Sequence, residues 1–160
     1  MPASLSPTAS VVAVTTPSRV RKLDDVPYVE VYGGRVQGVV SSSSDVERVY
    51  VSYFQADGFS CATNNNRPCG GLRGSPCKHL YKMLEEALVQ LGAERVVRGL
   101  GLACDPETIK RAPDVVRHLR GGALKAETGV VFARFLSYLR FLEIPASSEP
   151  APELAWFVAG

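Results

Sequence analysis

The segment spanning residues 58–80 limits the folding of this chain more than any other part. It contains four glycines, two prolines and three consecutive asparagines, and few large apolar side chains. Glycine, proline and asparagine favour turns, so this segment cannot form a core of its own. It does contain three thiols and one imidazole, at Cys61, Cys69, Cys77 and His79. The composition therefore indicates that something other than apolar packing orders the segment.

The spacing of these four residues, Cys-x7-Cys-x7-Cys-x-His, predicts one structural zinc ion. Zinc binds three thiolates and one imidazole in a tetrahedron that leaves no open position for a substrate. Cys77 directly precedes an apolar periodic stretch, so we expect it at a helix N-terminus, where the helix dipole stabilises a thiolate. His79 then lies in the first turn of that helix. We expect Cys61 just beyond a strand and Cys69 in the loop.

Other interpretations of the same residues remain open at this point. Cysteines are commonly small buried apolar groups. A Cys61–Cys69 disulfide with a free Cys77 is a second alternative, and a Cys77–His79 catalytic dyad is a third. The dyad has no third orienting residue that the sequence identifies. Outside the segment, Cys104 is expected in the core and His118 in solvent.

Hydrophobic periodicity predicts an α+β fold: a small antiparallel β-sheet, a zinc-bound loop and helix, and a helical C-terminal half. Residues 28–40 form a hairpin around Gly33-Gly34, because a two-residue turn requires positive φ. A third strand is expected over 46–54, with Val49, Val51 and Tyr53 facing the core and Ser52 facing water. Apolar residues at three- and four-residue spacing predict a helix over 78–91 that packs on the sheet.

Composition divides the chain into four regions. Residues 1–26 read as a flexible N-terminal tail, residues 27–92 as the zinc module, and residues 93–144 as a helical extension that includes a helix over 124–142. Residues 145–160 combine a proline-rich linker with an apolar C-terminal segment, which either docks on its own sheet or binds a partner. The sequence shows neither a signal peptide nor a membrane-spanning stretch, so we expect a cytoplasmic protein without membrane contact.

The stretch Pro76-Cys77-Lys78-His79-Leu80, with two cysteines before it, resembles the SWIM-type zinc finger over residues 46–91. That family has Cys-x-Cys, a variable spacer and Cys-x-His. This chain departs from the pattern at Thr63, so the role of the second cysteine passes to Cys69. The resemblance implies zinc binding through Cys61, Cys69, Cys77 and His79. It also implies DNA binding or protein interaction, as in members that accompany chromatin-remodelling helicases, transposases and recombinase paralogues.

Charge is distributed unevenly along the chain, although the formal net charge is only +2. Residues 67–125 carry eleven basic and six acidic side chains, and both flanking regions are slightly acidic. Six basic residues near the predicted module are candidate nucleic-acid contacts, DNA or RNA: Arg67, Arg73, Lys78, Lys82, Arg95 and Arg98. The sequence therefore favours a non-enzymatic module inside a larger complex, without a small-molecule substrate. The alternative is an adaptor for a helicase, recombinase or ribosomal assembly that does not touch nucleic acid.

Overall fold

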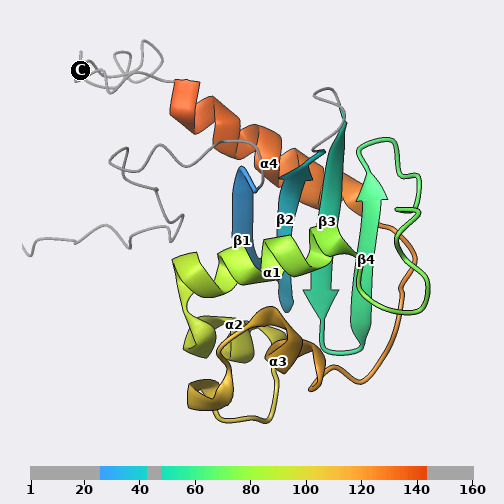
Figure 1. The fold of residues 1–160 in the computed structure, drawn as a ribbon. Coiled ribbons are helices and arrows are strands. Elements are labelled where there is room, and N and C mark those ends of the chain that lie inside the picture. Colours follow the sequence, from blue (N-terminus) through green and yellow to red (C-terminus); the bar gives the residue numbers. More distant parts are fainter. Residues whose placement is uncertain (1–25, 43–47, 144–160) are drawn as a thin grey trace, which may run out of the picture.

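A four-stranded antiparallel sheet forms the centre of the computed structural model, which describes residues 26–42 and 48–143. The strands follow one another in space as they do in sequence, in the order β1-β2-β3-β4 (Figure 1). Their bounds are β1 Tyr28–Tyr32, β2 Arg35–Ser41, β3 Val49–Gln55 and β4 Gly58–Thr63. The α+β prediction is confirmed. Residues 1–25 of the predicted tail and the whole predicted C-terminal region, 145–160, lie outside the described residues.

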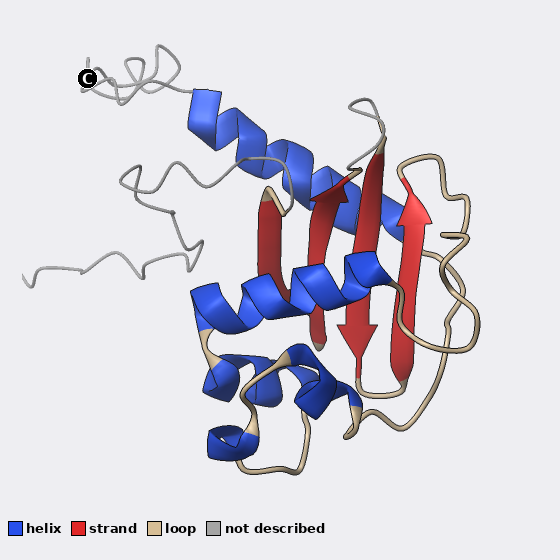
Figure 2. Ribbon diagram, in the orientation of Figure 1, coloured by secondary structure: helices blue, strands red, loops and turns tan. Residues whose placement is uncertain are grey.

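Helices cover both faces of this sheet and make three layers (Figure 2). The first face carries α1 (Lys78–Leu91), α2 (Ala93–Leu100), the 3-10 turn η1 (Pro106–Thr108) and α3 (Ala112–Val116). The opposite face carries α4 (Thr128–Glu143), which contacts β2 and β3. Among the described residues, no helix is both long and apolar enough to cross a membrane.

The predicted hairpin is confirmed at its turn. Gly33 and Gly34 have φ values of 58° and 75°, a conformation that glycine adopts without steric cost. The prediction of three strands is wrong, because residues 58–63 form a fourth strand instead of the start of a loop. A two-residue connection, Ala56-Asp57, joins β4 to β3 as a second tight hairpin.

The larger core lies between the sheet and α1. Leu80, Met83, Leu84 and Ala87 of α1 are all fully buried there, as the spacing of apolar residues predicted. Gly38 of β2 permits the close packing, since a Cβ atom at this position would lie 3.0 Å from Met83 Cγ and 2.4 Å from the Tyr28 carbonyl oxygen. The α1 helix is therefore seated directly on the backbone of the sheet.

Ser52 corrects one expectation from the sequence. It was expected to face water, but it is fully buried on the α1 side of β3. The periodicity of the third strand indicated one apolar face, whereas helices cover both faces of the sheet. Val51 and Tyr53 point the other way and pack with Val131 of α4. A polar side chain on the buried face needs a hydrogen-bond partner, and Ser52 finds one in the site described below.

An ionic contact fastens α4 to β1. Arg134 donates to both carboxylate oxygens of Glu30, with Nη2 at 2.8 Å from Oε2, and its guanidinium lies 3.6 Å from the centre of the Tyr32 ring. Gln37 Nε2 also donates to Glu30, at 2.7 Å. Burial alone raises the pKa of Glu30, but the hydrogen bonds, first among them that from Arg134, outweigh it and hold the pKa below its usual value. The carboxylate is therefore ionised at neutral pH.

Replacing Glu30 by glutamine is expected to lower the free energy of unfolding at pH 7 by about 1–2 kcal/mol, the range for a hydrogen-bonded ion pair that is partly exposed. Because the folded-state pKa is depressed, the contribution is present above the unfolded pKa of about 4.3 and is lost as the pH falls through the folded value. Urea denaturation of both proteins at pH 7 and pH 3.5 measures the difference.

A matched control for Glu30→Gln is Glu127→Gln. Glu127 pairs with Arg35 at 2.9 Å, but its side chain is 62% exposed. Exposed ion pairs contribute little, so this control is expected to change stability by less than about 0.5 kcal/mol. An equal loss for Glu30→Gln at both pH values would show that the carboxylate charge does not stabilise the contact.

The outer edge of β4 is covered by two separate segments. Cys69 N–H donates to the Cys61 carbonyl at 2.9 Å, and Pro68 bridges to Ala62. Nearer the start of β4, residues 120–124, here called the strap, run beside Phe59. Phe59 N–H donates to the Gly122 carbonyl at 3.0 Å, and Leu124 N–H donates to the Phe59 carbonyl at 2.8 Å. The strap leads from the α1 face to the α4 face. The predicted helix over 124–142 therefore begins later, at Thr128, because Leu124 is paired with the sheet.

Candidate metal centre

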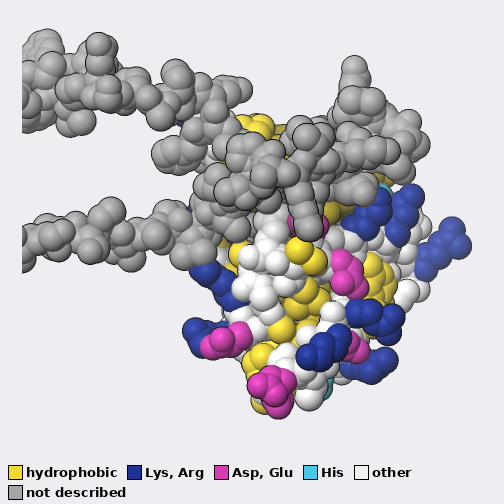
Figure 3. Space-filling model, turned by 60° about the vertical axis from the view of Figure 1, so that its left-hand side comes forward, with side chains coloured by type: hydrophobic (Ala, Val, Ile, Leu, Met, Phe, Trp, Pro, Cys, Tyr) yellow, Lys and Arg dark blue, Asp and Glu magenta, His cyan; other side chains and the backbone are white. Residues whose placement is uncertain are grey.

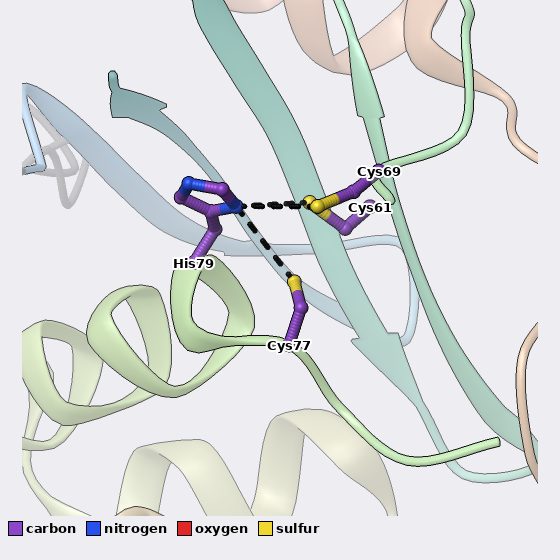
Figure 4. A group of neighbouring side chains, drawn as sticks. All are labelled: Cys61, Cys69, Cys77 and His79. Carbon is purple, nitrogen blue, oxygen red and sulfur yellow. Dashed lines mark hydrogen bonds between the residues drawn. The ribbon is translucent and has the colours of Figure 1, made fainter. Parts of the chain in front are cut away.

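Three parts of the fold bring Cys61, Cys69, Cys77 and His79 together (Figure 4). Cys61 follows the third strand, as predicted, but it lies within a further strand, β4, and its side chain points toward α1. Pairing of the following loop with the β4 edge places Cys69 beside it. Cys77 is the N-cap of α1 and His79 lies in the first turn, as predicted. All four side chains are buried.

The distances within this group suit a metal ion. His79 Nδ1 lies 3.4 Å from Cys69 Sγ, 3.9 Å from Cys77 Sγ and 4.0 Å from Cys61 Sγ. All four ligand atoms are within 4.8 Å of one another. A regular tetrahedron with Zn–S bonds of about 2.3 Å and Zn–N bonds of about 2.0 Å places nitrogen and sulfur about 3.5 Å apart. The group is thus a buried Cys3His set that could hold one metal ion.

Neighbouring groups hold the four side chains in place. Ser52, which pairs with Cys61 across β3 and β4, donates its hydroxyl to Cys61 Sγ at 3.4 Å. Gly71 N–H donates to Cys69 Sγ at 3.4 Å. The Tyr50 ring stacks on the His79 ring, with centroids 3.8 Å apart and planes 14° apart. Such outer contacts fix the orientation of metal ligands. None of these three contacts is evident from the sequence, because each depends on strand register or loop conformation.

The thiols differ in acidity. The pKa of Cys77 is lowered to about 4, chiefly because the Cys61 thiol donates a hydrogen bond to its sulfur, with support from the His79 ring and the Leu80 and His79 amides. The pKa of Cys61 is raised because it is that donor and because it is buried. Burial also raises the pKa of Cys69. Cys77 is therefore the most acidic of the three thiols, and it lies at the start of α1, where the helix dipole favours an anion.

The alternative interpretations fare differently. All four cysteines of the chain are free, so the Cys61–Cys69 disulfide is not formed. In the proposed dyad, Cys77 Sγ lies 3.9 Å from His79 Nδ1, which is longer than the 2.6–3.2 Å or so of a nucleophile and its base. Cys104 is half-buried against the main core, and His118 is exposed. Both therefore lie outside the metal group, as expected.

The six candidate nucleic-acid contacts fall into two groups. Arg67, Arg73, Lys78 and Lys82 are exposed on the loop and the first half of α1, beside the metal group. Arg95 and Arg98 belong to α2, beyond the far end of α1, and Arg98 pairs with Glu94 (Figure 1). Figure 3 shows basic side chains gathered toward the right of one face, with basic and acidic side chains side by side lower down. The first group, here called the basic quartet, is thus the one adjacent to the site.

In comparisons with known proteins, no protein-family model, no curated protein and no solved structure matches this chain. The class of site is therefore defined by its own geometry, as a buried Cys3His group at the junction of a β-strand, a loop and a helix N-terminus.

Proposed function

We propose that this chain is a non-enzymatic module that holds one structural zinc ion and binds nucleic acid, DNA or RNA, as a small component of a larger complex. The observation that carries the proposal is the position of the basic quartet: four exposed cations lie on a loop and helix start that also supply three of the four metal ligands. A metal ion that orders this loop also orders the side chains that meet the phosphates.

Zinc is the metal that the ligand set suits best. Thiolates together with one imidazole favour zinc over calcium, magnesium or manganese, which prefer oxygen ligands. All four positions of a tetrahedron would be filled by protein atoms, which is typical of structural and not of catalytic zinc. The Cys-x-His pair at the start of α1, following antiparallel strands, supports a SWIM-type module with Cys69 in the role of the second cysteine.

Nucleic-acid binding follows from charge and placement. The loop between β4 and α1 contains Arg67 and Arg73 and no acidic residue, and Lys78 and Lys82 extend the charge along α1. Exposed cations on a rigid support bind phosphates and release counterions, so the affinity falls with salt. Zinc would act here by position: it fixes the loop, and the loop presents its arginines.

Replacing Arg67 or Arg73 by glutamine is expected to weaken binding to a mixed-sequence oligonucleotide uniformly and to reduce the slope of log K against log salt by about 1 for each residue. Arg140→Gln, an exposed arginine of α4 on the opposite face, is the control and is expected to leave the slope unchanged. Fluorescence anisotropy at several salt concentrations measures both. A native affinity that does not vary with salt would contradict the proposal.

A protein adaptor without nucleic-acid contact is the second candidate. Val130 and Leu136 of α4 are 56% and 45% exposed, and a partner protein could cover them. The apolar C-terminal segment within residues 145–160, which was expected to dock on its own sheet or to bind a partner, lies outside the described residues. This candidate predicts that the chain has no affinity for nucleic acid, or an affinity that does not change with salt. It also predicts that Leu136→Lys loses its partner protein, which an affinity purification from the source would measure.

A further inference from the structure

A pocket of about 290 Å³ opens beside the loop between β4 and α1, where that loop meets the strap and the residues that precede α4. It lies at the covered edge of β4, with Ser60 in its wall. Cys61 also lines the pocket, together with residues of the loop, the strap and its continuation: Asn66, Pro68, Leu72, Leu124, Lys125 and Ala126. The volume is near the lower end of the range of about 300–1,000 Å³ for small-molecule sites, so it suits one small planar group.

Both apolar and polar side chains line this pocket. Pro68, Leu72 and Leu124 supply apolar surface, while Asn66 and Lys125 supply polar and charged groups. Asn66 is held in place from α4, because Thr128 Oγ1 donates to its Oδ1 at 3.2 Å. Its amide N–H groups are then directed to other acceptors. Its φ of 61° lies in the left-handed region, which asparagine adopts more readily than most residues.

We propose that the pocket accepts one unstacked nucleobase of a single-stranded nucleic acid, an inference that rests on the proposed function. A base has flat apolar faces and a rim of carbonyl and ring-nitrogen acceptors, which suit apolar walls with one amide donor. Exposed Arg67 stands between the lining residues Asn66 and Pro68, next to the phosphates that would flank such a base. None of the described residues that line the pocket is acidic.

The proposal selects single strands over duplexes. In a duplex the bases are stacked and paired, so a base reaches such a pocket only after the energy of unstacking is supplied. Single strands present their bases at little cost, and apolar contact with one base strengthens binding about tenfold. A bound metal ion would order one wall of the pocket, since Cys61 itself lines it and Cys69 lies between the lining residues Pro68 and Leu72.

The test compares two fluorescein-labelled twelve-nucleotide single strands, one of mixed sequence and one in which abasic sugars replace the bases. The native chain is expected to bind the strand with bases about tenfold more tightly. Ala126→Trp fills the pocket and is expected to bind both strands at the abasic level. Ala133→Trp places the same ring on the exposed side of α4, outside the pocket, and is expected to keep the native preference.

Each outcome decides between the two proposals. If the native chain binds neither strand, the proposed function fails and the pocket fails with it. If the native chain binds both strands equally, or Ala126→Trp keeps the tenfold preference, the pocket alone is overturned. If Ala126→Trp no longer binds metal, Asn66→Gly is used instead, because glycine adopts the positive φ of this position without strain. That variant is expected to reduce the preference below about threefold, and a full preference would overturn the pocket.

Discussion

Replacing Cys77 by serine is expected to reduce bound zinc from one ion per chain to far less than one and to lower the melting temperature by about 10–20 °C. This range corresponds to a loss of about 4 kcal/mol, a fraction of the 10–16 kcal/mol or so that structural zinc contributes in small domains. Cys77 makes no side-chain capping hydrogen bond, and serine is a favourable N-cap residue, so the substitution does not weaken the start of α1 by loss of a cap. The loss therefore reports on the metal ion. Elemental analysis and thermal unfolding by circular dichroism measure the two quantities.

The matched control for Cys77→Ser is Cys104→Ser. Cys104 is a free, half-buried thiol outside the metal group, so this variant is expected to keep one zinc ion per chain. A chelator added to the native protein should lower its melting temperature to that of Cys77→Ser and should not affect that variant further. Native protein with well under one metal ion per chain, together with an unchanged melting temperature in Cys77→Ser, would refute the metal centre.

Replacing Gly38 by alanine is expected to lower the free energy of unfolding by about 3 kcal/mol, at the upper end for overpacking a core. The new Cβ would lie 2.4 Å from the Tyr28 carbonyl oxygen, and this atom belongs to the backbone of the neighbouring strand. To relieve these clashes, β1 must move away from β2. The contact of the new Cβ with Met83 also pushes α1 away from the sheet. Urea denaturation of native and variant proteins with metal bound measures the change.

Gly129→Ala tests whether that loss is specific to the place of Gly38. Gly129 is the second residue of α4, and a Cβ there would meet no atom within 4 Å. Alanine is the better helix former, so this variant is expected to be neutral or more stable by up to about 1 kcal/mol. Similar destabilisation of both variants would show that close approach at Gly38 does not limit the packing of α1.

Sequence periodicity predicted the elements whose signals are local. Both the hairpin around Gly33-Gly34 and the apolar stripe of α1 are specified by residues that are close together in the sequence. The fourth strand was missed because residues 58–63 are mostly small and one of its two edge partners, the strap at 120–124, is remote in sequence. The Asp57-Gly58 dipeptide is a hairpin signal that could have indicated it. Ser52 was assigned to solvent because the pattern could not show a second covering layer.

The four residues that could hold a metal ion were predictable because thiols and imidazoles reveal their chemistry by residue type. Their supports were not, since Ser52 reaches Cys61 only through the register of β3 and β4, and Tyr50 reaches His79 only once α1 is seated. The sequence also did not show how the basic residues are grouped in space. A run of basic residues along the chain became two groups in space, with Arg95 and Arg98 beyond the far end of α1.

The strap has a consequence for the order of synthesis. A ribosome completes β4 long before it delivers residues 120–124, so the nascent chain presents Phe59 with an unpaired backbone N–H and carbonyl while α1, α2 and α3 are still being made. An unpaired strand edge is a template for other extended chains. Arrival of the strap closes that edge from within the same molecule. The connection between α3 and α4 thus also acts as an intramolecular guard against pairing between newly made chains.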